Sequence, residues 1–128
     1  MKNILKNILL VDDDRNLCEV LKLSLSAQGY NVIVSHDGKD ALAKVESEKP
    51  SLMILDVGIP VLNGIELCKL IKTSEKFKQI PVIMLTAGKT IGDWQNGFDA
   101  GADVYMNKPY DWDALAATIQ GFLKDPEK

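Results

Sequence analysis

Five short runs of apolar residues recur along the chain, and a longer segment with helical periodicity follows each one. Every run is too short for a helix, and most are rich in Leu or β-branched residues, which favours strands. The runs are Ile8–Val11, Val32–Val34, Leu52–Leu55, Val82–Leu85 and Val104–Met106. Their apolar residues are continuous and do not alternate with polar ones, as is typical of strands covered on both faces. The runs therefore predict a parallel sheet.

The segments that follow the strands carry apolar residues three or four positions apart, the spacing of a helix with one buried face. These faces are Leu17–Leu21–Leu25, Ala41–Leu42–Val45, Ile65–Cys68–Ile71, Ile91–Trp94–Phe98 and Trp112–Leu115–Ile119–Phe122. Five strands alternating with five helices predict right-handed crossovers and a three-layer α/β sandwich. We expect one domain over residues 1–128, with its core at about 6–124 and a short polar C-terminal tail.

The 128-residue chain has a net charge of only −3, which provides no basic field to hold nucleic acid or an anionic membrane. Cys18 and Cys68 match no zinc or redox spacing, so buried free thiols are favoured over a disulfide and suggest a reducing compartment. No apolar stretch is long enough for an export signal or a membrane span. We therefore expect a cytoplasmic protein that binds neither nucleic acid nor membrane directly.

Chemically active side chains stand where the predicted strands end. Asp12 and Asp13 follow the first strand, Asp56 the third, Thr86 the fourth and Lys108 the fifth. In open α/β sheets ligands bind beyond the carboxyl ends of the strands, so these groups are expected to converge. Clustered carboxylates repel one another unless a cation joins them, and Mg²⁺ prefers such oxygen ligands. Carboxylates, a cation, a hydroxyl and an ammonium are the parts needed for phosphoryl transfer onto a carboxylate nucleophile.

Five motifs in order carry a family resemblance: Val-Asp-Asp-Asp, Leu-Asp-Val-Gly-Ile-Pro with Asn-Gly after it, Leu-Thr-Ala, Gly-Ala-Asp-Val-Tyr and Lys-Pro-Tyr. Over residues 6 to 124 the chain resembles the response-regulator receiver domains of two-component systems, of the chemotaxis-regulator kind. The resemblance implies a flavodoxin-like fold with strand order 2-1-3-4-5. It also implies phosphorylation by a sensor histidine kinase or a histidine phosphotransfer protein, and no enzymatic activity beyond the domain's own phosphorylation and dephosphorylation.

Residue by residue, the resemblance makes Asp56 the phosphoacceptor. Asp12, Asp13, Asp56 and the backbone carbonyl of Gly58 would hold Mg²⁺, for which Mn²⁺ can substitute. Thr86 and Lys108 would bind the phosphoryl group, and Tyr105 would be the aromatic switch that turns inward when Thr86 moves. The Lys108–Pro109 bond resembles one that is cis in the family.

The resemblance also implies that side chains two residues beyond Asp56 and Thr86 tune the lifetime of the phosphorylated state. Gly58 and Gly88 occupy these two positions and provide no side chain. The implied output surface comprises the fourth helix, the fifth strand and the fifth helix. Trp94 and Trp112 fall in this region and mark a possible partner surface together with Tyr105. Helical spacing fits a core position for either tryptophan equally well.

Several residues have simpler interpretations. Asp14 is better suited to capping the first helix than to binding a metal, and Tyr105 could be plain core packing. His36 ends the second strand away from the acids and is interpreted as an ordinary surface or turn residue. The stretch Lys72–Lys78 is interpreted as a solvated loop, and Gly64 as a turn or cap glycine.

Two other classes of function stay open beside the switch: a degenerate receiver that binds partners without phosphorylation, and an enzyme or flavin carrier on the same fold. A degenerate receiver would lack some of the acids or the lysine, whereas this chain has them all. A flavin protein would need a phosphate loop rich in Ser, Thr or Gly after the first strand, where three acids stand. Magnesium-dependent labelling by a small phosphodonor discriminates among the classes. No output domain follows Phe122, so a stand-alone regulator and a piece of a longer protein are equally compatible, and the pathway is not specified.

Overall fold

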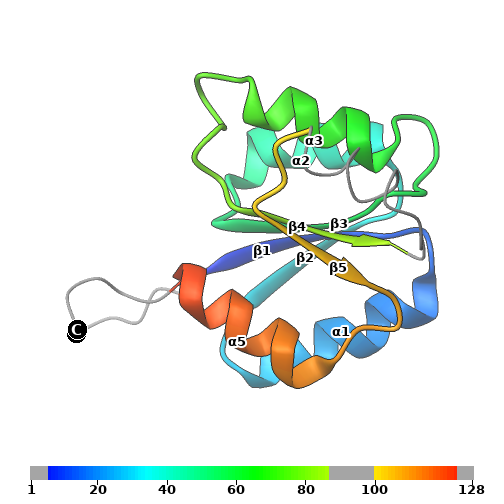
Figure 1. Cartoon of the computed structure of the whole chain (residues 1–128), viewed down its shortest axis with the longest axis vertical. Coiled ribbons are helices and arrows are strands. Elements are labelled where there is room, and N and C mark those ends of the chain that lie inside the picture. Colours follow the sequence, from blue (N-terminus) through cyan, green and yellow to red (C-terminus); the bar gives the residue numbers. More distant parts are fainter. Residues whose placement is uncertain (1–5, 87–99, 124–128) are drawn as a thin grey trace.

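The computed structural model describes residues 6–86 and 100–123, which form a parallel sheet with helices on both faces (Figure 1). The strands are β1 (Asn7–Val11), β2 (Asn31–Ser35), β3 (Leu52–Asp56), β4 (Val82–Thr86) and β5 (Val104–Asn107). Their order across the sheet is β2-β1-β3-β4-β5, and every neighbouring pair is parallel. The flavodoxin-like order predicted from the sequence is confirmed.

The helices form the two outer layers of the sandwich. In Figure 1, α1 (Arg15–Ala27) and α5 (Trp112–Leu123) cover one face of the sheet. On the opposite face lie α2 (Gly38–Glu48) and α3 (Gly64–Lys72). The fourth helix expected around Ile91–Phe98 lies outside the described residues. None of the described helices is long and apolar enough to cross a membrane.

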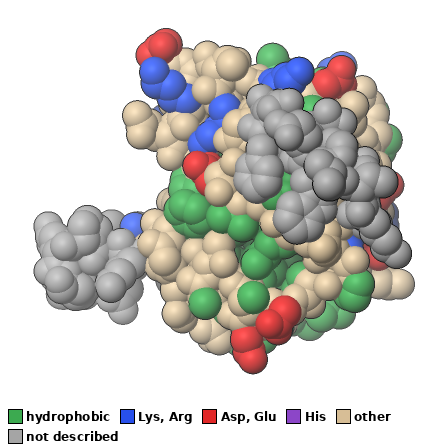
Figure 2. All heavy atoms as spheres, viewed as in Figure 1, with side chains coloured by type: hydrophobic (Ala, Val, Ile, Leu, Met, Phe, Trp, Pro, Cys, Tyr) green, Lys and Arg blue, Asp and Glu red, His purple; other side chains and the backbone are tan. Residues whose placement is uncertain are grey.

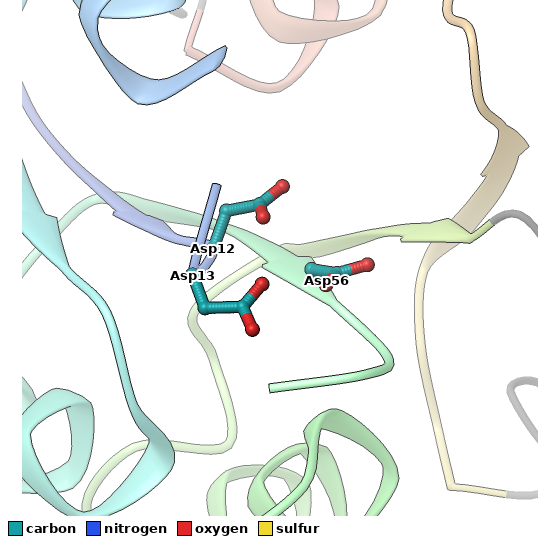
Figure 3. A group of neighbouring side chains, drawn as sticks. All are labelled: Asp12, Asp13 and Asp56. Atoms are coloured by element: carbon teal, nitrogen blue, oxygen red, sulfur yellow. The ribbon is translucent and has the colours of Figure 1, made fainter. Parts of the chain in front are cut away.

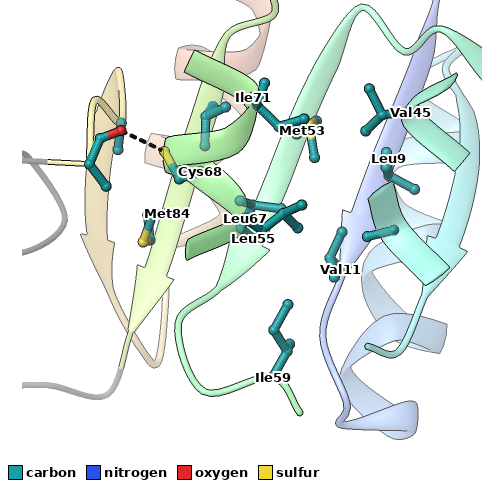
Figure 4. Close-up of a cluster of buried hydrophobic side chains, with 14 of the residues drawn as sticks. Leu9, Val11, Val45, Met53, Leu55, Ile59, Leu67, Cys68, Ile71 and Met84 are labelled. Carbon is teal, nitrogen blue, oxygen red and sulfur yellow. Dashed lines mark hydrogen bonds between the residues drawn. The ribbon is translucent and has the colours of Figure 1, made fainter. Parts of the chain in front are cut away.

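Each face of the sheet has its own hydrophobic core because successive side chains of a strand point to opposite sides. Leu9 and Val11 of β1 pack with α2 and α3, in the cluster drawn in Figure 4. Ile8 and Leu10 pack on the other face with α1 and α5. Burial on both faces explains why the strands are continuously apolar.

Both cysteines are buried free thiols, as expected from the sequence. The Sγ atom of Cys68 lies 3.6 Å from the carbonyl oxygen of Ala100 (Figure 4). The Cys18 Sγ lies 3.3 Å from the carbonyl oxygen of Asp12. Burial raises the pKa of each thiol to about 11, so both are protonated at neutral pH.

The helices on both sides begin with side-chain caps close to the carboxyl ends of the strands. Asp14 caps α1 by accepting a hydrogen bond from the Leu17 backbone N–H, which confirms the capping role predicted for it. Asp37 and Asn63 cap α2 and α3 in the same way.

One residue of the apolar face predicted for the last helix is not buried. Phe122 of α5 is 39% exposed.

The interpretation of Lys72–Lys78 as a solvated loop is wrong for Lys72. This residue ends α3, and its Nζ donates to the carbonyl oxygens of Ile80 at 2.7 Å and Lys78 at 3.1 Å. It also pairs with Asp103 at 2.9 Å. The same Asp103 oxygen accepts the Val82 backbone N–H at 2.8 Å. Lys72 therefore ties α3 to the amino ends of β4 and β5, which a charge pattern in the sequence does not reveal.

Candidate functional site

Three carboxylates meet at the carboxyl ends of β1 and β3. One oxygen each from Asp12, Asp13 and Asp56 lies within 4.8 Å of the other two (Figure 3). Asp12 is buried, Asp56 half-buried and Asp13 exposed, so the group opens to solvent on the Asp13 side. The central strands β1 and β3 are neighbours in the sheet, which brings acids 43 or more positions apart in the sequence to one place. The expected convergence of the three acids is therefore present.

Lys108 joins this group from the segment after β5. Its Nζ lies 2.8 Å from an Asp12 oxygen and 3.2 Å from an Asp56 oxygen. The Lys108 backbone N–H donates to the Thr86 carbonyl at 2.7 Å, so the end of β4 holds the lysine in place. The Lys108–Pro109 bond is cis, as the family resemblance implied.

The electrostatics of the site follow from burial and crowding. Desolvation, followed by the negative charge of Asp12, raises the pKa of the Asp56 carboxyl although Lys108 opposes the shift. Burial by itself would lower the pKa of the Lys108 ammonium, but its hydrogen bond to Asp12 and the charges of Asp12 and Asp56 leave that pKa raised. The ammonium thus compensates only part of the negative charge, and a cation would be attracted to the remainder.

The three acids fit a magnesium ion by their chemistry and spacing. An octahedral Mg²⁺ with bonds of about 2.0–2.1 Å holds its ligand oxygens about 3–4 Å apart. Carboxylates within 4.8 Å of one another reach that arrangement by small side-chain movements. Gly58, whose carbonyl is the further ligand implied by the resemblance, lies two residues beyond Asp56 in the loop that follows β3.

The loop after Asp56 is held close to the site by glycines. A Cβ atom at Gly64 would lie 2.3 Å from the Asp56 backbone oxygen, and one at Gly38 would lie 1.8 Å from the Leu62 carbonyl oxygen. Gly64, the first residue of α3, is therefore required by a close approach of α3 to β3 as well as by its place at the start of a helix. Within the loop Val61 has φ 73°, and the Leu62 N–H donates to the Pro60 carbonyl at 2.8 Å, which defines a tight γ-turn.

The remaining predicted residues lie along β4, β5 and α5. Thr86 ends β4 and is buried, one position beyond the residue that pairs with Asp56. Tyr105 is 7% exposed and belongs to the core cluster on the α3 side, so its ring points inward. Trp112 is half-buried and packs against the other cluster. Figure 2 shows hydrophobic side chains gathered over β5 and the adjoining part of α5. Gly88 and Trp94 lie outside the described residues.

One residue near the acids was misjudged from the sequence. His36 was interpreted as an ordinary surface or turn residue, but its ring is half-buried and its Nδ1 lies 2.9 Å from the backbone carbonyl oxygen of Asp12. The only available signal was its place directly after β2, the strand beside β1. That position alone does not say which way a side chain turns.

A fold of this order, with three acids and a lysine at the carboxyl edge of the sheet, is the arrangement of a receiver domain. The chain matches the family model described as the response regulator receiver domain over residues 8–120, and it belongs to that family. It is 40% identical over 122 residues to the alkaline phosphatase synthesis transcriptional regulatory protein PhoP of Bacillus subtilis. This alignment covers 95% of the present chain and 50% of PhoP.

Solved structures agree with this assignment. A response-regulator crystal structure from Chloroflexus aurantiacus has a TM-score of 0.89 and 34% identity, and the match covers 95% of this chain and all of the other. The chemotaxis protein CheY4 of Vibrio cholerae has a TM-score of 0.85 and 31% identity, with 94% and 100% covered. The chain spans about half the length of the curated relatives it matches.

Proposed function

We propose that this protein is a phosphorylation-dependent switch in which Asp56 accepts a phosphoryl group from a phosphohistidine of a sensor histidine kinase or a histidine phosphotransfer protein. The observation that carries the proposal is the contact of one ammonium, that of Lys108, with both Asp12 and Asp56 inside the three-acid group. This arrangement places a partly buried carboxylate nucleophile beside a fixed positive charge. Receiver-family membership supports a role in two-component signalling.

The transfer step requires an in-line approach of an Asp56 oxygen to phosphorus. The new P–O bond forms as the P–N bond to the donor histidine breaks, and the electron pair of that bond stays on the imidazole. Lys108 stabilises negative charge on the phosphoryl oxygens, and the Thr86 hydroxyl at the end of β4 donates a hydrogen bond to one of them. Asp12, Asp13, Asp56 and the Gly58 carbonyl would hold Mg²⁺, or Mn²⁺ in its place. The bound cation supplies compensating charge for the transferred group.

The signal would leave the site through β4 and β5. Thr86 and Lys108 are linked by the backbone hydrogen bond between them, and Tyr105 lies in the strand that leads to Lys108. Once the phosphoryl group recruits Thr86 and Lys108, the surface formed by the fourth helix, β5 and α5 changes and controls a partner or an output domain. We place this function in one domain, residues 1–128, and in the cytoplasm.

The low net charge of −3 supports a role without direct nucleic-acid contact for these 128 residues. The relative PhoP carries the words transcriptional regulatory protein in its name and is about twice as long. A longer form of the present protein could therefore act on transcription through its additional residues.

Incubation with a small phosphodonor such as acetyl phosphate, followed by mass spectrometry of the intact protein, tests the proposal. We expect a gain of one phosphoryl mass with Mg²⁺ and none after chelation. Asp56→Asn keeps the size of the side chain but removes the nucleophile, so labelling should vanish while the circular dichroism spectrum is unchanged. Full labelling of Asp56→Asn would refute Asp56 as the acceptor.

A further inference from the structure

The backbone of Asp12 is held by the end of β2 at both of its polar atoms. The Asp12 N–H donates to the Ser35 carbonyl at 3.1 Å, which continues the parallel ladder between β1 and β2. The Asp12 carbonyl oxygen lies 2.9 Å from Nδ1 of His36, the next residue along. The chain leaves the sheet after Ser35, so no further backbone N–H of a continued β2 donates to the Asp12 carbonyl. The His36 imidazole donates to it instead.

This hydrogen bond fixes the tautomer of the ring. A carbonyl oxygen only accepts, so Nδ1 must carry a proton and donate it. The second donor to the same oxygen is the Cys18 thiol at 3.3 Å, a weaker hydrogen-bonding group. His36 is therefore the stronger of the two side-chain donors that orient this carbonyl.

The carbonyl belongs to the peptide that joins Asp12 to Asp13. The Asp12 carboxylate has its own supports, because one oxygen accepts the Asp14 N–H at 3.0 Å and the other pairs with Lys108. Within the described residues, no donor bonds the Asp13 carboxylate. The direction of the Asp13 side chain thus depends on the backbone that carries it, and above all on the plane of the Asp12–Asp13 peptide.

We infer that His36 is a positioning residue for the metal site: its Nδ1–H holds the Asp12–Asp13 peptide so that the Asp13 carboxylate points at the space shared with Asp56. The inference rests on the proposed function, because it assumes that these acids bind Mg²⁺. It assigns to β2, a strand with none of the predicted site residues, a share in the geometry of the site.

Variants at position 36 separate the hydrogen bond from the bulk of the ring. His36→Leu removes the donor. His36→Asn places an amide nitrogen where Nδ1 stands, and His36→Gln places it where Nε2 stands. Lys44→Met is the matched control, since the Lys44 Nζ donates to the carbonyl of Val34, a residue of the same strand, at 2.8 Å. All four variants keep the proposed metal ligands.

Calorimetric titration with Mg²⁺ alone measures the effect, and urea unfolding of each variant measures stability separately. We expect the Kd for Mg²⁺ to rise about tenfold in His36→Leu, the lower end of the range for residues that orient metal ligands. His36→Asn should recover most of the affinity, whereas His36→Gln should not. Lys44→Met should bind Mg²⁺ like the original protein. If His36→Leu does not fold, the comparison of Asn with Gln carries the test.

Two outcomes would overturn the inference: an unchanged Kd in His36→Leu, whether or not its stability falls, or equal losses of affinity in the Asn and Gln variants. Failure of the proposed function looks different. In that case the original protein would not bind Mg²⁺ at all, or Asp13→Asn would bind it equally well. Neither result would depend on the residue at position 36.

Discussion

At the scale of single residues, Asp56 combines two demands that oppose each other. As the proposed nucleophile Asp56 must be ionised, yet burial and the neighbouring Asp12 raise the pKa of this carboxyl. The raised pKa means that ionising this carboxyl costs more free energy in the folded protein than in the unfolded chain. Lys108 offsets part of this cost through its contact with the same carboxylate. An added cation would therefore relieve the remaining repulsion at this site.

This opposition predicts a pH dependence of stability. Because the pKa of Asp56 is raised in the folded protein, the folded state binds more protons than the unfolded state just above the ordinary carboxyl value of 3.8. The free energy of unfolding contributed by this group therefore falls as pH rises through that window and stays lowered at pH 7. In metal-free buffer, Asp56→Asn should be more stable than the original protein at pH 7, and the difference should shrink below pH 3.8.

Urea unfolding across this pH range measures the difference. Glu19→Gln is the control, because Glu19 is an exposed acid of α1 outside the three-acid group. Adding Mg²⁺ should stabilise the original protein more than Asp56→Asn. An Asp56→Asn variant that is less stable than the original at pH 7 without metal would contradict the argument.

Gly58 offers a second test at the same scale. A Cβ atom there would meet only an Asp56 oxygen at 3.7 Å, an ordinary contact, so a side chain fits. A lysine at this position would obstruct the water that attacks phosphorus in line. We expect Gly58→Lys to slow loss of the phosphoryl group several-fold, as followed by mass spectrometry after the donor is removed. Gly121→Lys adds the same charge to α5 and should leave the rate of phosphoryl loss unchanged. If Gly58→Lys does not slow this loss, access of water does not limit the lifetime of the phosphorylated state.

At the scale of elements, the strands were predictable because a parallel sheet buried on both faces requires continuous apolar runs, such as Leu52–Leu55. Their order was predictable only through the resemblance to receiver domains. The convergence of Asp12, Asp13 and Asp56 was predictable because all three stand at the carboxyl ends of parallel strands. The roles of His36, Lys72 and Gly64 were not, because each depends on a contact with the backbone of a distant segment. Sequence patterns describe which face of an element is apolar, but they do not describe which carbonyl a side chain reaches.

Lys72 shows what such a contact contributes to the fold. Its Nζ has three partners, and its side chain is only 16% exposed. Lys72→Met would leave the carbonyls of Lys78 and Ile80 without this donor and Asp103 without its cation. We expect a loss of about 2–3 kcal/mol in the free energy of unfolding, in line with hydrogen bonds to charged groups. Magnesium-dependent labelling of the folded variant should be unaffected, because the residue lies at the amino ends of β4 and β5.

Lys76→Met is the matched control for this measurement. Lys76 pairs with Glu46, but both side chains are more than half exposed, at 61% and 58%. Exposed pairs of this kind contribute about 0–1 kcal/mol. Equal losses in the two lysine variants would mean that burial does not set the difference.

At the scale of the whole molecule, the site and the proposed output surface are joined through the edge of the sheet. Lys108 contacts the acids with its side chain and Thr86 with its backbone, and α5 begins four residues later. Trp112, the first residue of α5, packs partly against the core that α5 shares with α1. A shift of the segment between β5 and α5 would therefore change the surroundings of this indole ring.

Fluorescence of Trp112 should report the switch. In a Trp94→Phe background Trp112 is the only tryptophan, and phosphorylation by acetyl phosphate with Mg²⁺ should change its emission. Adding Asp56→Asn should abolish the change, because no phosphoryl group is then bound. Adding Lys108→Ala should weaken the response, since in the proposed switch the ammonium contacts the phosphoryl group and links it to β5. Full labelling of the Trp94→Phe protein with no change at Trp112 would mean that the signal does not pass through the start of α5.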